Sequence, residues 1–121
     1  MIFCICACLC VSMAIAQNQT KKVLRHVVLF KFKETATPAN IKMVEEAFGK
    51  LPSQIKLIRA YEWGINNSPE KLNEGLTHCF TVTFATAKDR DDYLVYPAHK
   101  EFVKVLGPYL DKAVVVDYWT K

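Results

Sequence analysis

The chain has 121 residues, 51% of them hydrophobic and 23% charged, which is typical of a protein that folds around an apolar core. The formal net charge of +4 is modest, and the 16 Lys and Arg side chains form no basic block. These values exclude a disordered chain, and nucleic acid is not an expected partner. The length leaves room for one compact domain.

The first sixteen residues are expected to be a signal peptide. Residues 1–20 carry no charge, and the apolar run ends in Ala14-Ile15-Ala16, a small-x-small cleavage pattern. The run is shorter than the roughly twenty residues of a spanning helix, which favours a removed leader over a transmembrane helix. No membrane span is expected in the mature chain. The usual positive n-region is missing, which leaves a retained anchor or a misassigned start as alternatives. We therefore expect a periplasmic or secreted protein, with lipid anchoring at Cys8 as a minor alternative.

The cysteines indicate a mature chain without an intrachain disulfide. Four of the five lie inside the leader, and only Cys79 follows it. Cys79 alternates with His78 and shares its strand face with no histidine, so we interpret it as a small buried hydrophobe. Residues 17–23 then form an N-terminal tail, and residues 24–119 form the domain.

The patterning of this domain predicts four strands and two helical regions. A β-branched and apolar run predicts a strand at Leu24–Lys33, buried on both faces at its centre. Thr37-Pro38 predicts a helix start, and helical spacing continues until Pro52 is expected to end it. The remaining predictions are strands at Ile55–Gly64, Thr77–Ala85 and Ala113–Trp119, with a helix from Thr86 to Tyr96 that restarts at Pro97 and ends at Gly107-Pro108.

This order predicts an α+β domain of the ferredoxin-like type, βαββαβ, with a four-stranded antiparallel sheet. Helices can then cover only one face of the sheet. The other face still carries apolar side chains such as Val27 and Leu29, which would be exposed in a monomer. A second copy packed sheet to sheet would cover them and give a homodimeric α+β barrel.

Three histidines are the candidate functional residues. His26 and His78 lie on apolar strand faces, and His99 shares a helical face with Phe102. If the helices cover this side of the sheet, all three could meet in one cavity. Neutral core histidines remain the open alternative. No metal is predicted, because metal-ligand spacing is absent and no Asp or Glu is clearly placed with the histidines.

Aromatic residues are abundant on the same faces. They either form core or line a pocket for a small apolar or aromatic ligand, and the sequence leaves both open. We take His26, His78, Phe30, Phe80 and Trp63 as candidate ligand-binding residues. Asp89, Asp91 and Asp92 with Arg90 are interpreted as a solvated helix face without chemistry.

Several motifs together resemble the stress-responsive A/B barrel (Dabb) domain family over about Leu24 to Trp119. They are LRHVVLFKFK from Leu24, Glu74-Gly75 with Thr77-His78, Asp92-Tyr93, and Pro97-Ala98-His99 with Phe102. The resemblance implies a dimeric ferredoxin-like barrel. It also implies that no cofactor is needed, because a plant polyketide cyclase of this family closes a ring by an aldol reaction without metal or organic cofactor.

The resemblance also assigns roles. The cyclase's catalytic histidine and tyrosine resemble His99 and Tyr93, and its strand histidines resemble His26 and His78. The family commonly has His-Pro-x-His where this chain has Tyr96-Pro97-Ala98-His99.

Three functions are consistent with the sequence. The first is an exported homodimeric module that binds a small ligand. The second is a cofactor-free aldol-type enzyme with His99 as general base and Tyr93 as hydrogen-bond donor. The third is a haem-binding or oxygen-using protein, because other dimeric α+β barrels include such proteins.

Overall fold

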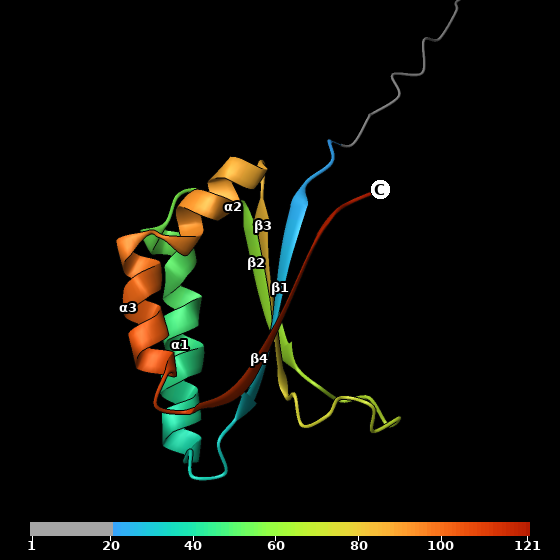
Figure 1. Ribbon diagram of the computed structural model, residues 1–121, viewed down its shortest axis with the longest axis vertical. Coiled ribbons are helices and arrows are strands. Elements are labelled where there is room, and N and C mark those ends of the chain that lie inside the picture. Colours follow the sequence, from blue (N-terminus) through green and yellow to red (C-terminus); the bar gives the residue numbers. More distant parts are fainter. Residues whose placement is uncertain (1–20) are drawn as a thin grey trace, which may run out of the picture.

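The computed structural model describes residues 21–121, and the signal peptide expected over residues 1–16 lies outside them. The described chain forms four strands and three helices (Figure 1): β1 (Leu24–Phe32), α1 (Pro38–Gln54), β2 (Ala60–Ile65), β3 (His78–Phe84), α2 (Ala87–Leu94), α3 (Pro97–Leu106) and β4 (Leu110–Trp119). Within this range, no helix combines the length and apolarity needed to cross a membrane.

The strands form one antiparallel sheet in the order β2-β3-β1-β4. All three helices lie on the same side of this sheet, and the β2–β3 connection projects to the other side (Figure 1). The predicted ferredoxin-like α+β fold is therefore confirmed.

The start of α1 follows the predicted capping chemistry. The Asn40 backbone N–H donates to the Thr37 hydroxyl at 3.1 Å, and the Thr37 N–H donates to the Asn40 side chain at 2.9 Å. These two bonds satisfy donors that a helix start leaves unpaired. Pro38 occupies the first turn, where a missing N–H costs nothing.

The end of α1 differs from the prediction. The helix continues through Pro52 to Gln54, because a proline in the last turn removes only one helical donor and the Ile55 N–H still reaches the Leu51 carbonyl at 2.8 Å. Ile55 is then the fully buried residue that ends the helix, rather than the start of a strand. The second strand accordingly begins at Ala60, five residues later than Ile55.

The core lies between the helices and the sheet. Phe48 of α1 stacks on Phe80 of β3 with ring centroids 4.2 Å apart and an interplanar angle of 2°. Burial alternates along β1, with the side chains that face the helices buried and the others half-buried. The buried hydrophobic residues are Leu24, Val28, Phe30, Val44, Phe48, Leu51, Ile55, Phe80, Val82, Phe84, Tyr93, Phe102 and Leu106.

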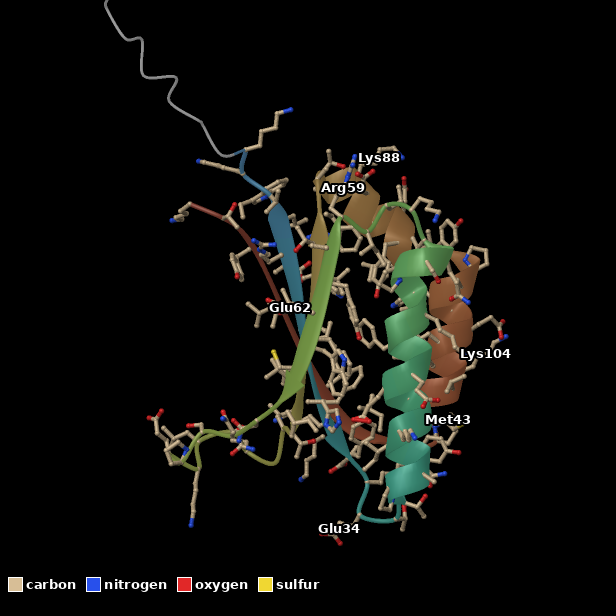
Figure 2. All side chains as sticks on the ribbon, turned by 180° about the vertical axis from the view of Figure 1, so that it is seen from behind. Glu34, Met43, Arg59, Glu62, Lys88 and Lys104 are labelled. Atoms are coloured by element: carbon tan, nitrogen blue, oxygen red, sulfur yellow. The ribbon has the colours of Figure 1, made fainter. Side chains whose placement is uncertain are left out.

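Among residues 21–121, no helix covers the opposite face of the sheet. Val27 and Leu29 are half-buried, and Val116 of β4 is 54% exposed. Full burial of β1 on both faces is therefore not found in one chain. Figure 2 shows Glu62 of β2 on this open side and Lys104 of α3 on the outer surface of the helix layer.

Candidate functional site

A cleft of about 570 Å³ lies between the helix-facing side of β1 and β4 and helices α2 and α3. One end is apolar and is lined by Phe30, Leu106 and Ala113. The other end carries all of its polar side chains, namely His26, Asp117, Arg90, Asp91, Tyr93 and His99. A largely apolar hollow with a few convergent polar groups is the usual form of a small-molecule site.

Tyr93 of α2 lies at the polar end. The residue is 1% exposed, and its ring lies 4.6 Å from the His99 ring and 5.8 Å from the His26 ring, measured between centroids. Burial raises the pKa of Tyr93, with a smaller contribution from Tyr61. The phenol therefore stays protonated at physiological pH and can donate a hydrogen bond.

His99 lies near the start of α3. Its Nδ1 is 3.1 Å from the backbone carbonyl of Leu94, and a carbonyl only accepts, so Nδ1 carries the proton. The other ring nitrogen, Nε2, is then left with its lone pair and can act as a base. Burial lowers the pKa of His99 below 6.5, outweighing the opposing effect of the Leu94 carbonyl. The imidazole is therefore neutral at neutral pH.

His26 of β1 belongs to a polar chain that crosses the cleft. Its Nδ1 lies 2.7 Å from one carboxylate oxygen of Asp117 on β4, and the other oxygen accepts from Nη1 of Arg90 at 3.0 Å. Nε of Arg90 also donates to Asp91 at 2.9 Å. This chain ties β1, β4 and α2 together at the polar end of the cleft.

These contacts correct two sequence interpretations. Asp117 is an acidic residue placed directly against a histidine, where none was expected. Arg90 and Asp91 line the cleft instead of forming only a solvated helix face. One signal was available in the sequence, because Asp117 is the single charge in the apolar run AVVVDYW. The contact of Arg90 left no such signal, because it depends on where α2 lies relative to β4.

His78 lies outside the cleft, in a cluster between β3 and α1. Its Nε2 is 2.9 Å from the carboxylate of Glu45, its Nδ1 is 2.8 Å from the Thr77 hydroxyl, and its ring stacks on Trp63 at 5.9 Å. In the antiparallel pairing, His26 lies opposite Val82, four residues from His78 along β3. Four residues of strand correspond to about 13 Å. The structure therefore brings together two of the three histidines.

Of the other candidate ligand-binding residues, one lines the cleft and two lie outside its lining. Phe30 lines the apolar end of the cleft, four residues from His26 along β1, whereas Phe80 is fully buried in the core. Trp63 is 42% exposed and stacks over Phe80 on the β2 side of the sheet. Within residues 21–121, no group of three or more His, Cys, Asp or Glu side chains is arranged to hold a metal ion.

Sequence comparison identifies relatives over most of the chain. The chain is 34% identical over 101 residues to a stress-response A/B barrel domain-containing protein of Arabidopsis thaliana, covering 84% of this chain and 93% of the relative. It is 28% identical over 95 residues to olivetolic acid cyclase of Cannabis sativa, covering 78% and 94%.

Solved structures share the fold. The hydroxynitrile lyase from Passiflora edulis superposes with a TM-score of 0.78 at 25% identity, covering 84% of this chain and 96% of the lyase. A dimeric protein of ferredoxin-like fold from Bacteroides fragilis superposes with a TM-score of 0.67 at 25% identity, covering 81% and 96%. The pattern of the stress-responsive A/B barrel domain matches residues 24–120, and the chain therefore belongs to the Dabb family.

Proposed function

We propose that the protein is an enzyme that transfers a proton at the carbon next to a carbonyl group, with His99 as general base and Tyr93 as hydrogen-bond donor. The observation that carries this proposal is the pairing of the two rings, 4.6 Å apart at the polar end of one apolar cleft. Their opposite pKa shifts support the same roles, because His99 is kept neutral and Tyr93 is kept protonated.

The proposed step uses only these two side chains. Nε2 of His99 takes the proton from the carbon next to the carbonyl, and the electrons of that C–H bond move toward the carbonyl oxygen. The Tyr93 hydroxyl donates a hydrogen bond to this oxygen as it gains negative charge. The apolar walls exclude water and strengthen that hydrogen bond.

Two similar proteins support an enzymatic role by their names, which are those of a cyclase and a hydroxynitrile lyase. A second candidate function keeps the cleft but not the chemistry, with the protein acting as a module that binds a small apolar ligand. The neutral His99 and the apolar lining suit both functions. The enzyme would remove a proton from a bound ketone, whereas the ligand-binding module would not.

Acetophenone in D₂O tests the proposal without knowledge of the natural substrate, because enolisation exchanges its methyl protons for deuterium. We expect NMR to show exchange above the buffer rate, lowered about 10²- to 10⁴-fold in His99→Ala. Tyr93→Phe should lose about 10²-fold, the usual effect of one donor to an oxyanion.

Tyr96→Phe is the matched control, because Tyr96 is 38% exposed and lies outside the cleft lining. It should exchange like the parent, and melting temperatures should show that all variants fold. Binding of acetophenone without exchange would favour the ligand-binding module. Exchange that is unchanged in His99→Ala would overturn the role of His99.

A further inference from the structure

The charged side chains of the cleft are few and are already paired. Its lining contains one cation, Arg90, and two carboxylates, Asp91 and Asp117, so the formal charge is −1 when the histidines are neutral. No lysine lies among these described lining residues. The cleft is thus locally acidic, although the chain as a whole carries a net charge of +4.

Arg90 is not a free anion receptor. Its Nε and Nη1 donate to Asp91 and Asp117 at 2.9 and 3.0 Å, so two carboxylates already surround its single positive charge. Sites that bind carboxylate or phosphate usually offer an unpaired Arg fork or a Lys. An incoming anion at Arg90 would face both aspartates at close range.

The adjacent helices carry three lysines, Lys88 of α2 and Lys100 and Lys104 of α3. Lys88 pairs with Asp92 and Lys104 pairs with Glu101, both on exposed surfaces. None of the three lysines lines the cleft. An anion that entered it would therefore lose hydration without gaining a counter-charge, which is unfavourable.

We infer that the cleft selects neutral carbonyl compounds with an apolar body and discriminates against free carboxylates and phosphates. The carbonyl group would lie at the polar end near Tyr93 and His99, and the apolar body would lie along Phe30, Leu106 and Ala113. This inference rests on the proposed function and specifies its class of substrate.

The test compares two molecules of nearly equal size and shape, acetophenone and benzoate. Both are titrated into the full chain at about pH 8, where histidines of ordinary pKa are neutral. NMR of the C2 protons of His26 and His99 reports binding in the cleft, and His78 reports on the rest of the molecule. We expect acetophenone to bind at least about tenfold more tightly than benzoate, because only benzoate brings a charge toward the two aspartates.

Two substitutions on α2 test whether the carboxylates of the cleft cause the difference in affinity. Asp91→Asn removes a carboxylate of the cleft lining and should reduce the ratio of the acetophenone affinity to the benzoate affinity about threefold. The effect is small because the Asp91 side chain is 64% exposed and its charge is screened by solvent. Asp92→Asn changes the net charge by the same amount, but Asp92 does not line the cleft, so the ratio of the two affinities should stay the same.

Three other results would contradict the inference, and they differ in what they imply for the proposed function. Equal or tighter binding of benzoate at His26 and His99 would overturn the selectivity and leave the proposed proton transfer standing. An equal effect of Asp91→Asn and Asp92→Asn would show that bulk charge causes the difference, which also overturns the inference. If neither probe moves the His26 and His99 signals, both the inference and the proposed function fail.

Discussion

His99 is held between two opposing effects at the carbonyl end of α2. Burial favours its neutral form, and the hydrogen bond from Nδ1 to the Leu94 carbonyl favours the protonated form. Burial is the larger effect, so the folded pKa lies below 6.5. A base with this property keeps its lone pair throughout the neutral range.

The lowered pKa of His99 predicts how its protonation and the proposed activity depend on pH. We expect its C2 proton to titrate with a midpoint below 6.5, and proton exchange from acetophenone to be constant near neutrality and to fall only through that lower midpoint. Between the folded pKa and 6.5 the unfolded chain binds more protons, so stability attributable to His99 declines as the pH falls through this range. His78→Gln should leave the midpoint unchanged. A midpoint at or above 6.5 would contradict the assigned environment.

At the scale of elements, Glu45 and His78 add a polar contact between α1 and β3 to the stacking of Phe48 on Phe80. The Glu45 and His78 side chains are 19% and 6% exposed, and their bond of 2.9 Å joins a helix to a strand 33 residues away. The pair also acts on Tyr61, since burial and then the charge of Glu45 raise the pKa of this tyrosine to about 12. The cluster therefore has a structural role, and it lies at the end of the sheet away from the polar end of the cleft.

Glu45→Ala should lower the free energy of unfolding by about 1–3 kcal/mol, because it leaves a buried imidazole nitrogen without its partner. Urea denaturation measures this loss, and absorbance at 295 nm should show that Tyr61 ionises at a lower pH. Glu46→Ala is the control on the next residue, where the carboxylate is 62% exposed and 3.9 Å from Lys42. It should change stability by less than about 0.5 kcal/mol. Equal losses in the two variants would contradict the role of the cluster.

At the scale of the whole molecule, the face of the sheet opposite the helices is an apolar surface. Leu29 of β1 pairs with Cys79 of β3 and Val114 of β4, which places three apolar side chains side by side on the face that no helix covers. The similar protein from Bacteroides fragilis is dimeric. We propose that two copies of this chain associate through the same face.

Sedimentation should therefore give a dimer at micromolar concentration. Leu29→Asp should convert it to monomer or unfold it, because an unpaired charge at a dry interface costs several kcal/mol. Val95→Asp is the control, since Val95 is 64% exposed at the end of α2 on the helix side. A folded monomer of the parent chain at this concentration would overturn the proposed assembly.

Local patterns correctly predicted the order of the elements and the fold, because strand alternation and helix-capping residues act over short stretches of sequence. Thr37-Pro38 and Thr86 both start helices as predicted, and His78–Phe84 alternates as a strand. Local rules did not determine where α1 ends, because the energetic effect of Pro52 depends on its place in the last turn. They also placed Ile55 in a strand, although it closes the helix against the core.

Which polar groups share the site depends on how the strands pair and how the helices pack on the sheet. The family resemblance pointed to Tyr93 and His99, which lie close in sequence and on consecutive helices. Asp117 meets His26 across 91 residues because β4 pairs with β1 in one register, and the pairing of β1 with β3 moves His78 toward the other end of the sheet. Strand register is set by the packing of the whole sheet, so no local pattern contains it. The charge balance around Arg90 likewise depends on long-range packing, because Arg90 of α2 meets Asp117 of β4 only where this helix lies against this strand.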